Sequence, residues 1–293
     1  MPELAEVKIM SEYINSVTKN RVFKGIRKTE TSKQDIIKTE YPFTITAGSR
    51  GKELMLHINE SGSKSRLISM SMGMTGNWSI TQTGYENKHA QLMFDMDGGA
   101  TLSLVDMRRF AKWKEVDGWS SKRGPCPLTQ HLEFVKHIED GIKNSKAFDK
   151  PICELMMDQK WFNGIGNYLR AEILYRVKET VNPFEPAKTA LRNCPSILDL
   201  CYHVVEESYK AGGGELKDWD NPYTRGYGLG RINKHKKKEV PLNFRDWLQC
   251  YQKESSVIDS KKRRFWFSST YKDQADIYLK TKKAITDEVH KNI

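Results

Sequence analysis

The hydrophobic pattern of this chain changes its period once, at the segment Lys-Arg-Gly-Pro-Cys-Pro that spans residues 122–127. Before this segment, from about residue 21 to about residue 110, apolar residues alternate with polar ones or form short runs, as in antiparallel strands. After it, apolar residues recur every three to four positions, as in helices that bury one face. A strand-rich half followed by a helical half indicates an α+β protein.

The strand-rich half is expected to contain one helix and an antiparallel β-sandwich. Residues 1–12 have a rough helical apolar face, formed by Leu4, Val7, Ile9 and Met10. The strongest local signal is Asp-Gly-Gly at 97–99, which joins two strand-like runs as in a β-hairpin.

The helical half contains a glycine-rich turn, Asn-Gly-Ile-Gly-Asn, at residues 163–167. Helices are expected at 129–143, 149–162, 168–177 and 194–212. The glycines allow positive φ angles and a close approach of the backbone to another molecule. The N–H groups at the start of the next helix form a ready anion site. A plain helix hairpin that needs glycine for a tight turn is the alternative.

The charge of the chain is concentrated near its C-terminal end. The net charge is +11, and residues 231–293 hold sixteen Lys and Arg against eight Asp and Glu. Basic residues are interleaved with aromatics at 261–267, which favours contact with phosphates, whereas the run at 234–238 equally fits a solvated surface. The excess of basic over acidic residues indicates a polyanion partner, and nucleic acid is the first candidate.

The cysteines and the apolar runs exclude several classes of protein. No apolar run approaches the roughly 18 residues of a membrane span, so we expect an intracellular protein. The five cysteines are scattered and form no Cys-x2-Cys pair, which argues against a thiolate zinc site and a disulfide framework. They are Cys126, Cys153, Cys194, Cys201 and Cys250.

The segment Asp-Gln-Lys-Trp-Phe-Asn-Gly-Ile-Gly-Asn-Tyr-Leu-Arg-Ala-Glu-Ile-Leu-Tyr-Arg at 158–176 resembles the helix–two-turn–helix of the Fpg/Nei DNA glycosylases. That family also begins Met-Pro-Glu and carries a lysine in a strand of its first domain, matched here by Lys52. Within the family, the motifs at 123–126, 148–154 and 266–268 resemble the endonuclease VIII-like 1 branch. The Lys- and Asn-rich composition suggests an AT-rich genome, such as that of a giant virus.

The resemblance implies a domain order and a finger without zinc. Most family members carry four zinc-binding cysteines in a C-terminal finger, but no cysteine follows Cys250 here. A zincless β-hairpin of the same shape is therefore expected, and no metal or other cofactor. The expected segments are a catalytic β-sandwich domain at 1–124, a linker at 125–134, the helix–two-turn–helix domain at 135–250, the finger at 251–271 and a C-terminal tail at 272–293.

The resemblance implies catalysis by the N-terminal residues. Removal of the initiator methionine is expected before a proline, and Pro2 then carries a secondary amine with a pKa of about 7.7–8.0 in the absence of perturbation. Such an amine attacks a sugar C1′ and forms a Schiff base, while Glu3 moves protons. Lys52 would lower the pKa of the amine, bind a phosphate or protonate the base. Glu6 either orients the site or is an ordinary glutamate of the helix surface.

Further residues are matched to DNA contacts. Met74, Arg108 and Phe110 correspond to the side chains that fill the space left by an extruded nucleotide, although Met74 also suits core packing. Gly164, Gly166 and Asn167 correspond to a phosphate-binding turn, and Arg263, with Arg264 in reserve, to the finger arginine. His89 resembles a phosphate-contacting histidine on a strand, and a structural histidine is the alternative.

The resemblance implies a monomeric bifunctional glycosylase and abasic-site lyase that removes oxidised pyrimidines and hydantoins from double-stranded, and in some cases single-stranded, DNA. Residues 212–233 are the expected lesion-recognition loop, and a nuclear location is expected if the source is eukaryotic. A DNA-binding protein without catalysis on the same scaffold and an RNA-binding protein are the alternatives.

Overall fold

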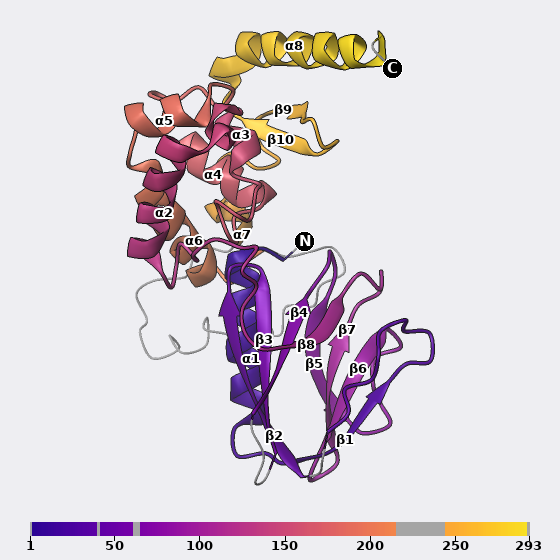
Figure 1. Ribbon diagram of the computed structural model, residues 1–293. Helices are drawn as coiled ribbons and strands as arrows, with labels where there is room; N and C mark the ends of the chain where they lie inside the picture. Colours follow the sequence, from indigo (N-terminus) through magenta and orange to yellow (C-terminus); the bar gives the residue numbers. More distant parts are fainter. Residues whose placement is uncertain (1, 40–41, 61–64, 215–243, 292–293) are drawn as a thin grey trace. The chain divides into compact units, whose positions relative to one another are not determined.

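The structure is a computed structural model and describes residues 2–39, 42–60, 65–214 and 244–291 (Figure 1). The chain forms two compact units, one of residues 1–121 and 207–245 and one of residues 122–206 and 246–293. Residues 207–245 were expected in the second unit, but Tyr209 donates to Glu12 Oε2 at 2.5 Å, which ties the end of helix α6 (Ile197–Lys210) to the first unit.

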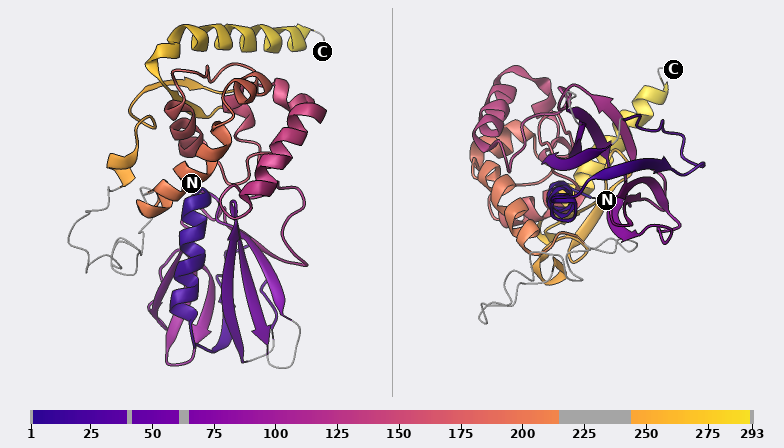
Figure 2. Two further views of the ribbon diagram at one scale, coloured as in Figure 1. Left: turned by 90° about the vertical axis from the view of Figure 1, so that its left-hand side faces the viewer. Right: turned by 90° about the horizontal axis from the view of Figure 1, so that it is seen from below.

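The first unit begins with helix α1, which spans Leu4–Thr18 and lies along one face of the sheet (Figure 2). The helix ends six residues later than its apolar pattern over residues 1–12 predicted. Its last turns are bound to the sheet, since Thr18 Oγ1 donates to the Ile45 carbonyl at 3.0 Å and Asn15 exchanges two hydrogen bonds with Ala47. Tertiary hydrogen bonds therefore extend the helix beyond its apolar signal.

Eight strands of the first unit form one antiparallel sheet in the order β5-β7-β6-β1-β2-β3-β4-β8. The strands are β1 Phe23–Lys28, β2 Phe43–Arg50, β3 Glu53–Glu60, β4 Arg66–Ser71, β5 Asn77–Gln82, β6 Ala90–Met96, β7 Ala100–Val105 and β8 Lys112–Val116. Strands β1 and β2 share the single pair Phe23–Phe43. This weak link lets the two halves of the sheet fold toward each other.

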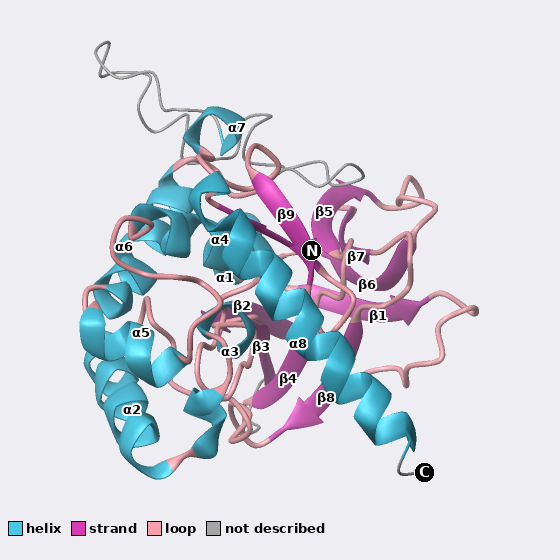
Figure 3. Cartoon of the chain, turned by 90° about the horizontal axis from the view of Figure 1, so that it is seen from above, coloured by secondary structure: helices cyan, strands magenta, loops and turns pink. Residues whose placement is uncertain are grey.

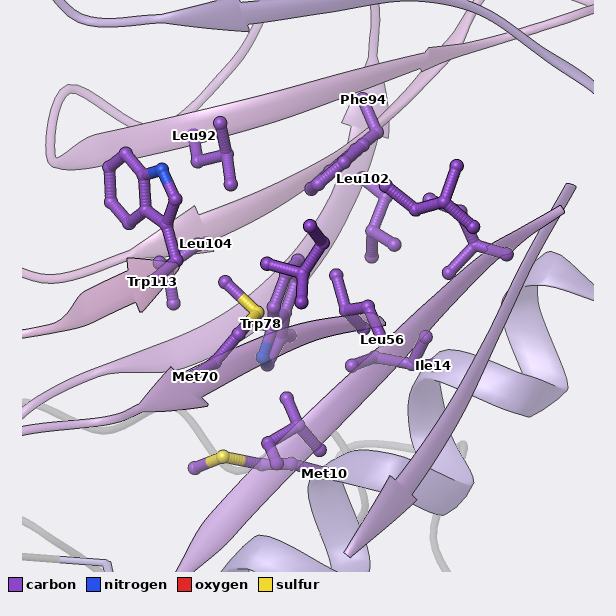
Figure 4. Packing of buried hydrophobic residues seen from close by; sticks show 14 of the residues in the cluster. Met10, Ile14, Leu56, Met70, Trp78, Leu92, Phe94, Leu102, Leu104 and Trp113 are labelled. Atoms are coloured by element: carbon purple, nitrogen blue, oxygen red, sulfur yellow. The ribbon is translucent and has the colours of Figure 1, made fainter. Parts of the chain in front are cut away.

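The core lies between the two halves of the sheet and α1 (Figure 4). Leu56 and Met70 from one half face Phe94 and Leu102 from the other, and Met10 is contributed by the helix. The expected sandwich is thus a single sheet folded on itself. The predicted hairpin at 97–99 joins β6 to β7, and Gly98 and Gly99 both have φ of +78°, the conformation that favours glycine.

The second unit consists of helices and one β-hairpin (Figure 3). Its helical elements are α2 His131–Asn144, α3 Ile152–Leu155, α4 Asn167–Arg176, α5 Ala187–Asn193, the first part of α6 and α8 Lys272–Lys291; α7 Phe244–Trp247 lies across the division between the units. The hairpin pairs β9 (Ser255–Ile258) with β10 (Arg264–Phe267). The residues expected to form a C-terminal tail thus contain a long helix. None of the helices in the described residues has the length and apolar content needed to cross a membrane.

The helix predicted over residues 149–162 is wrong for most of its length. Only Ile152–Leu155 is α-helical. The Ile152 and Cys153 N–H groups donate to the carbonyls of Glu185 and Pro183, and the Cys153 carbonyl accepts from Arg170 at 2.7 Å. These partners from other segments replace the hydrogen bonds of a longer helix.

Gly141 of α2 is expected to resist replacement by alanine. A Cβ at this position would collide with the Trp161 ring and would lie 2.5 Å from a ring carbon of Phe148. Gly141→Ala should therefore lower the free energy of unfolding by about 1–3 kcal/mol through overpacking. In an open helix the same change stabilises by about 0.5–1 kcal/mol. Urea unfolding measures the difference.

The matched control is Gly118→Ala, because an added Cβ there has no neighbour within 4 Å among the described residues. We expect its free energy of unfolding to change by no more than about 0.5 kcal/mol. A Gly141→Ala protein more stable than wild type would contradict the tight packing of this helix.

Candidate active site

The expected catalytic residues Pro2 and Glu3 are buried at the N-terminal end of α1. Glu3 is only 2% exposed and occupies the N-cap position of the helix. Its backbone N–H donates to Glu6 Oε2 at 2.7 Å, the bond by which a glutamate three residues inside a helix holds the N-cap backbone. The start of the chain is therefore held in a defined conformation.

Glu6 also binds the segment that follows α6. It is 1% exposed, which rules out the interpretation as a helix-surface glutamate. Its Oε1 accepts from the Gly214 N–H at 2.5 Å. Gly213 has φ of +71°, and a Cβ there would lie 2.8 Å from the same oxygen. One carboxylate thus connects the N-terminal residues, which are the candidate catalytic ones, to the beginning of the expected recognition loop. Residues 215–233 of that loop and the basic run 234–238 lie outside the described residues.

Lys52 lies in a turn rather than in a strand, so this detail of the prediction is corrected. Arg50 and Glu53 are the last paired residues of β2 and β3, and Gly51 and Lys52 join them. Gly51 has φ of +58°. A tight two-residue hairpin requires such a conformation, and it moves the lysine from the pleated strand to the end of the sheet.

This turn lies at the same end of the first unit as the N-terminus of α1. The hydrogen bonds from Thr18 to Ile45 and from Asn15 to Ala47 show that the helix runs antiparallel to β2. From its last turn to its N-terminus the helix rises about 22 Å at about 1.5 Å per residue. A strand covers that length in about seven residues, which extends from Ile45 to Lys52. The lysine therefore belongs to the same end of the unit as Pro2 and Glu3.

Met74, Arg108 and Phe110 lie on two neighbouring exposed loops of the first unit. Met74 is 39% exposed in the turn between β4 and β5, while Met70 and Met72 are buried, so Met74 does not belong to the core. Phe110 is 50% exposed, and the Arg108 guanidinium lies 4.9 Å from its ring centroid. A Cβ on Gly73 would lie 2.7 Å from Phe110 Cβ, which places the two loops in direct contact.

His89 lies in the turn before β6, not on a strand as predicted. Its N–H donates to Asn87 Oδ1 at 2.8 Å, and its carbonyl accepts from the Asp106 N–H at 3.0 Å. The backbone of His89 is thus attached to the loop that carries Arg108 and Phe110.

In the second unit, the predicted glycine-rich turn precedes α4. Gly164 has φ of +97°, and its N–H donates to Gln159 Oε1 at 3.0 Å. Gly166 is the N-cap of α4. The Asn163 side chain is fully buried and donates to the Gly124 carbonyl at 2.9 Å. These contacts hold the turn at the N-terminal end of a helix, where an anion is stabilised.

Asn167 joins this turn to the β9–β10 hairpin. Its Nδ2 donates to the Arg264 carbonyl at 2.9 Å, and its Oδ1 accepts from Arg170 Nη2 at 2.7 Å. Arg170 is fully buried and forms an ion pair with Asp259 at 3.0 Å. Its guanidinium also lies 4.6 Å from the ring centroid of Phe265 on β10. Helix α4 therefore binds the hairpin by charge, hydrogen bonds and aromatic contact.

Asp259 shapes the turn that contains Arg263, the first candidate for the finger arginine. Its Oδ1 accepts from the N–H groups of Lys261 and Arg263 at 3.0 and 2.9 Å. Arg263 is half-buried in this turn, whereas Arg264 is exposed on β10 and donates to Ser256 Oγ at 3.2 Å. The two candidates for the finger arginine thus differ in exposure and in their contacts.

Glu172 is a further buried anchor that the sequence patterns did not single out. Its carboxylate accepts from the N–H groups of Gln249, Cys250 and Tyr251 at 2.8–2.9 Å and pairs with Arg176 at 3.0 Å. The sequence does contain an indication of this anchor, because Asn167, Arg170 and Glu172 lie among mostly apolar residues of the same helix. Such polar residues need partners from another segment.

Residues 1–113 match the family described as the formamidopyrimidine-DNA glycosylase N-terminal domain. The mouse protein Endonuclease 8-like 1 is 34% identical to this chain over an alignment of 300 residues. The alignment covers 91% of this chain and 72% of the mouse protein. This chain belongs to the Fpg/Nei family of DNA glycosylases.

Solved Fpg structures share the fold of this Fpg/Nei protein. Fpg (MutM) from Thermus thermophilus matches with a TM-score of 0.71 at 21% identity, over 92% of this chain and 98% of that one. Lactococcus lactis Fpg in complex with DNA that contains an abasic site matches with a TM-score of 0.69 at 18% identity, with the same coverage of both chains. At these identities the matches establish the fold alone.

The finger of this Fpg/Nei protein does not fit a zinc site. Residues 251–271 contain neither cysteine nor histidine, the ligands that structural zinc sites use. Within the described part of the chain, no three His, Cys, Asp or Glu side chains are grouped to hold a metal ion. Packing against other residues of the second unit holds the hairpin, since the Phe184 ring lies 6.0 Å from that of Phe265 and 5.1 Å from that of Phe267.

Proposed function

We propose that this protein is a bifunctional DNA glycosylase and abasic-site lyase of base excision repair. The observation that carries the proposal is the burial of Pro2 and Glu3 at the start of α1, at the end of the first unit to which the turn of Lys52 also belongs. An amine and a carboxylate held together away from water suit covalent catalysis with proton transfer. The similarity to mouse Endonuclease 8-like 1 supports it, and Fpg of L. lactis has been crystallised with abasic-site DNA.

Pro2 is the nucleophile of the proposed reaction. After removal of the initiator methionine, its amine attacks C1′ of the damaged nucleotide, and the bond from C1′ to the base breaks. The base leaves with the bonding electron pair and takes up a proton. The secondary amine and the opened sugar form a positively charged iminium, which accepts electrons during elimination. Loss of a C2′ proton expels the 3′ phosphate, and the second elimination expels the 5′ phosphate.

Glu3, Lys52 and Glu6 assist this chemistry in different ways. Glu3 protonates O4′ as the sugar opens and then exchanges protons with the intermediates. The ammonium of Lys52 lowers the pKa of the Pro2 amine by charge repulsion and binds the phosphate beside the lesion. Glu6 is a positioning residue, because both of its oxygens accept backbone N–H groups.

The substrate is DNA with a damaged base or an abasic site, and oxidised pyrimidines and hydantoins are the proposed lesions. A base inside a duplex has to leave the stack to reach Pro2. Met74, Arg108 and Phe110 fill the resulting space, with Met74 and Phe110 as apolar wedges and Arg108 as donor to the orphaned base. Their exposure on two adjoining loops supports this role. The protein acts as a monomer.

Phosphate contacts come from the second unit. The turn of Gly164 and Gly166 presents the N-terminal end of α4, where backbone N–H groups and the helix dipole attract an anion. Asn167 contributes the second N–H of its amide, which no described residue accepts. Arg263 of the finger contacts the phosphates beside the lesion, and His89 of the first unit contributes a further contact.

Borohydride trapping tests the proposed function. Wild type and Pro2→Gly are each incubated with a duplex that carries one oxidised pyrimidine and with one that carries an abasic site. Borohydride reduces a Schiff base to a stable bond, so we expect a covalent complex whose mapped peptide contains Pro2. The terminal amine of Pro2→Gly can also trap weakly, and peptide mapping therefore decides.

Each outcome of the trapping experiment has a defined meaning. Trapping on both duplexes supports glycosylase and lyase activities, while trapping on the abasic site alone keeps the lyase and excludes the chosen lesion. No trapping on either duplex removes the catalytic proposal and leaves a DNA-binding protein. Retention of the initiator methionine, measured by intact mass, would also exclude Pro2 as the nucleophile.

The salt dependence of DNA binding distinguishes Arg263 from Arg264. Each phosphate contact contributes about 0.9 to the slope of log K against log salt concentration. Arg263→Ala should lower the magnitude of this slope by about 0.9, the value of one phosphate contact. Arg264→Ala should change the slope less, because the Arg264 side chain already binds Ser256. Fluorescence anisotropy with an undamaged duplex at several salt concentrations measures the slope.

Arg192→Ala is the control, because Arg192 is exposed on α5 and has no proposed contact with DNA. It should leave the slope unchanged. A larger effect of Arg264→Ala than of Arg263→Ala would assign the finger contact to Arg264 instead.

A further inference from the structure

The loops of Met74 and of Arg108–Phe110 meet at a buried carboxylate that has no role in the proposed chemistry. Asp106 directly follows β7 and is 0% exposed. Its Oδ1 accepts from Thr75 Oγ1 at 2.5 Å and from the Arg108 N–H at 3.1 Å. Its Oδ2 accepts from the N–H groups of Phe110 and Ala111 at 2.6 and 2.7 Å.

All four partners of the Asp106 side chain are donors, so an acceptor-only carboxylate is the side chain that matches them. An asparagine of the same shape has only one acceptor oxygen. Its NH2 group would replace the other carboxylate oxygen and would face two of the four donors, with which it cannot form these hydrogen bonds. Water cannot replace the lost hydrogen bonds at a site with no exposure. The contacts are therefore specific for aspartate.

The backbone around Asp106 also holds an uncommon conformation. Arg109 has φ of +56°, a left-handed conformation that few non-glycine residues adopt. Its N–H donates to the Asp106 carbonyl at 3.2 Å, and the flanking N–H groups of Arg108 and Phe110 bind the Asp106 side chain. The turn therefore points Arg108 and Phe110 outward only while the carboxylate holds its backbone.

We propose that Asp106 is the positioning residue that holds Met74, Arg108 and Phe110 in one arrangement before DNA binds. Through Thr75 it connects the Met74 turn to the loop that follows β7. Preorganised side chains enter the space left by the extruded base without first being ordered, and this lowers the cost of extrusion. The inference rests on the proposed function and adds the residue on which nucleotide extrusion depends.

Asp106→Asn separates positioning from chemistry, because filling the stack is needed in a duplex but not in a single strand. We expect excision of an oxidised pyrimidine from a duplex to fall by on the order of tenfold to a hundredfold. Trapping on a single-stranded abasic oligonucleotide should stay within about twofold of wild type. Asp117→Asn, an exposed aspartate after β8, is the matched control and should leave both rates unchanged.

A second readout does not depend on catalysis. With 2-aminopurine opposite the lesion, insertion of Arg108 and its neighbours changes the fluorescence on binding, and Asp106→Asn should reduce that change at saturating protein. If wild type fails to trap on any substrate, the proposed function fails, and this signal still tests the role of Asp106. If wild type does not act on single strands, the fluorescence readout decides.

Thr75→Val serves if Asp106→Asn does not fold, because it removes one donor and keeps the three backbone contacts. We expect a smaller decrease in the ratio of duplex to single-strand activity and in the fluorescence change. An unchanged ratio and an unchanged fluorescence signal in the folded variants would overturn the proposal. An equal loss on duplex and single strand, with unchanged fluorescence, would also overturn it.

Discussion

Glu3→Gln should lower the single-turnover rate of base excision by about 10²- to 10⁴-fold, the usual contribution of a general acid or base. The amide keeps the size of the side chain but cannot carry the proton between the sugar oxygen and the departing groups. Glu3 is 2% exposed, so bulk water has little access to replace it. The measurement is rapid-quench excision from a duplex with one oxidised pyrimidine.

The variant should still fold, because the hydrogen bond to Glu6 uses the backbone N–H of Glu3 and not its side chain. Glu30→Gln is the matched control, since Glu30 is exposed in the same unit, and it should react at the wild-type rate. An excision rate of Glu3→Gln within about threefold of wild type would exclude proton transfer by this carboxylate, because even a modest general acid contributes more.

Arg170→Met should lower the free energy of unfolding by about 3–5 kcal/mol, the effect of removing one partner of a buried ion pair. The variant leaves Asp259 without its cation and removes the donors to Cys153 and Asn167. These contacts connect α4 with the finger, so the affinity for an undamaged duplex should fall as well. Urea unfolding and fluorescence anisotropy measure the two effects.

A double-mutant cycle isolates the ion pair. Asp259→Asn removes the charge and keeps an oxygen for the N–H groups of Lys261 and Arg263. The double variant, Arg170→Met with Asp259→Asn, should lose less free energy of unfolding than the two single variants lose together. The expected difference is about 0.5–3 kcal/mol. Arg192→Met, on an exposed arginine, is the control. Strict additivity of Arg170→Met and Asp259→Asn would contradict a direct interaction between the two side chains.

Local patterns predicted the elements whose conformation depends on neighbours in the chain. The Asp-Gly-Gly hairpin at 97–99 and the turn at 163–167 were predicted because positive φ is accessible to glycine at little cost. The apolar period also predicted a helix over 129–143, observed at His131–Asn144, and the end of α6 just before the glycines at 212–214. The family resemblance, rather than any period, indicated Pro2 and Glu3.

Distant partners explain where these predictions failed. The helix expected over 149–162 is cut short because carbonyls of residues 183–185 and the side chain of Arg170 bind its first residues. Lys52 and His89 were assigned to strands, but both lie in turns, since strand periodicity does not show where pairing ends. The helix at 272–291 was missed because its described apolar residues include exposed ones such as Ile277 and Leu279.

The order of residues along the chain was sufficient to predict the α+β class and the glycine turns, because each depends on near neighbours or on residue type. The tertiary structure alone decided which polar groups are buried. Arg170 meets Asp259 from 89 positions away, and Asp106 meets Thr75 from 31. A buried charge is stable only with partners that the fold brings to it, so these contacts became visible only once the strands and helices were packed.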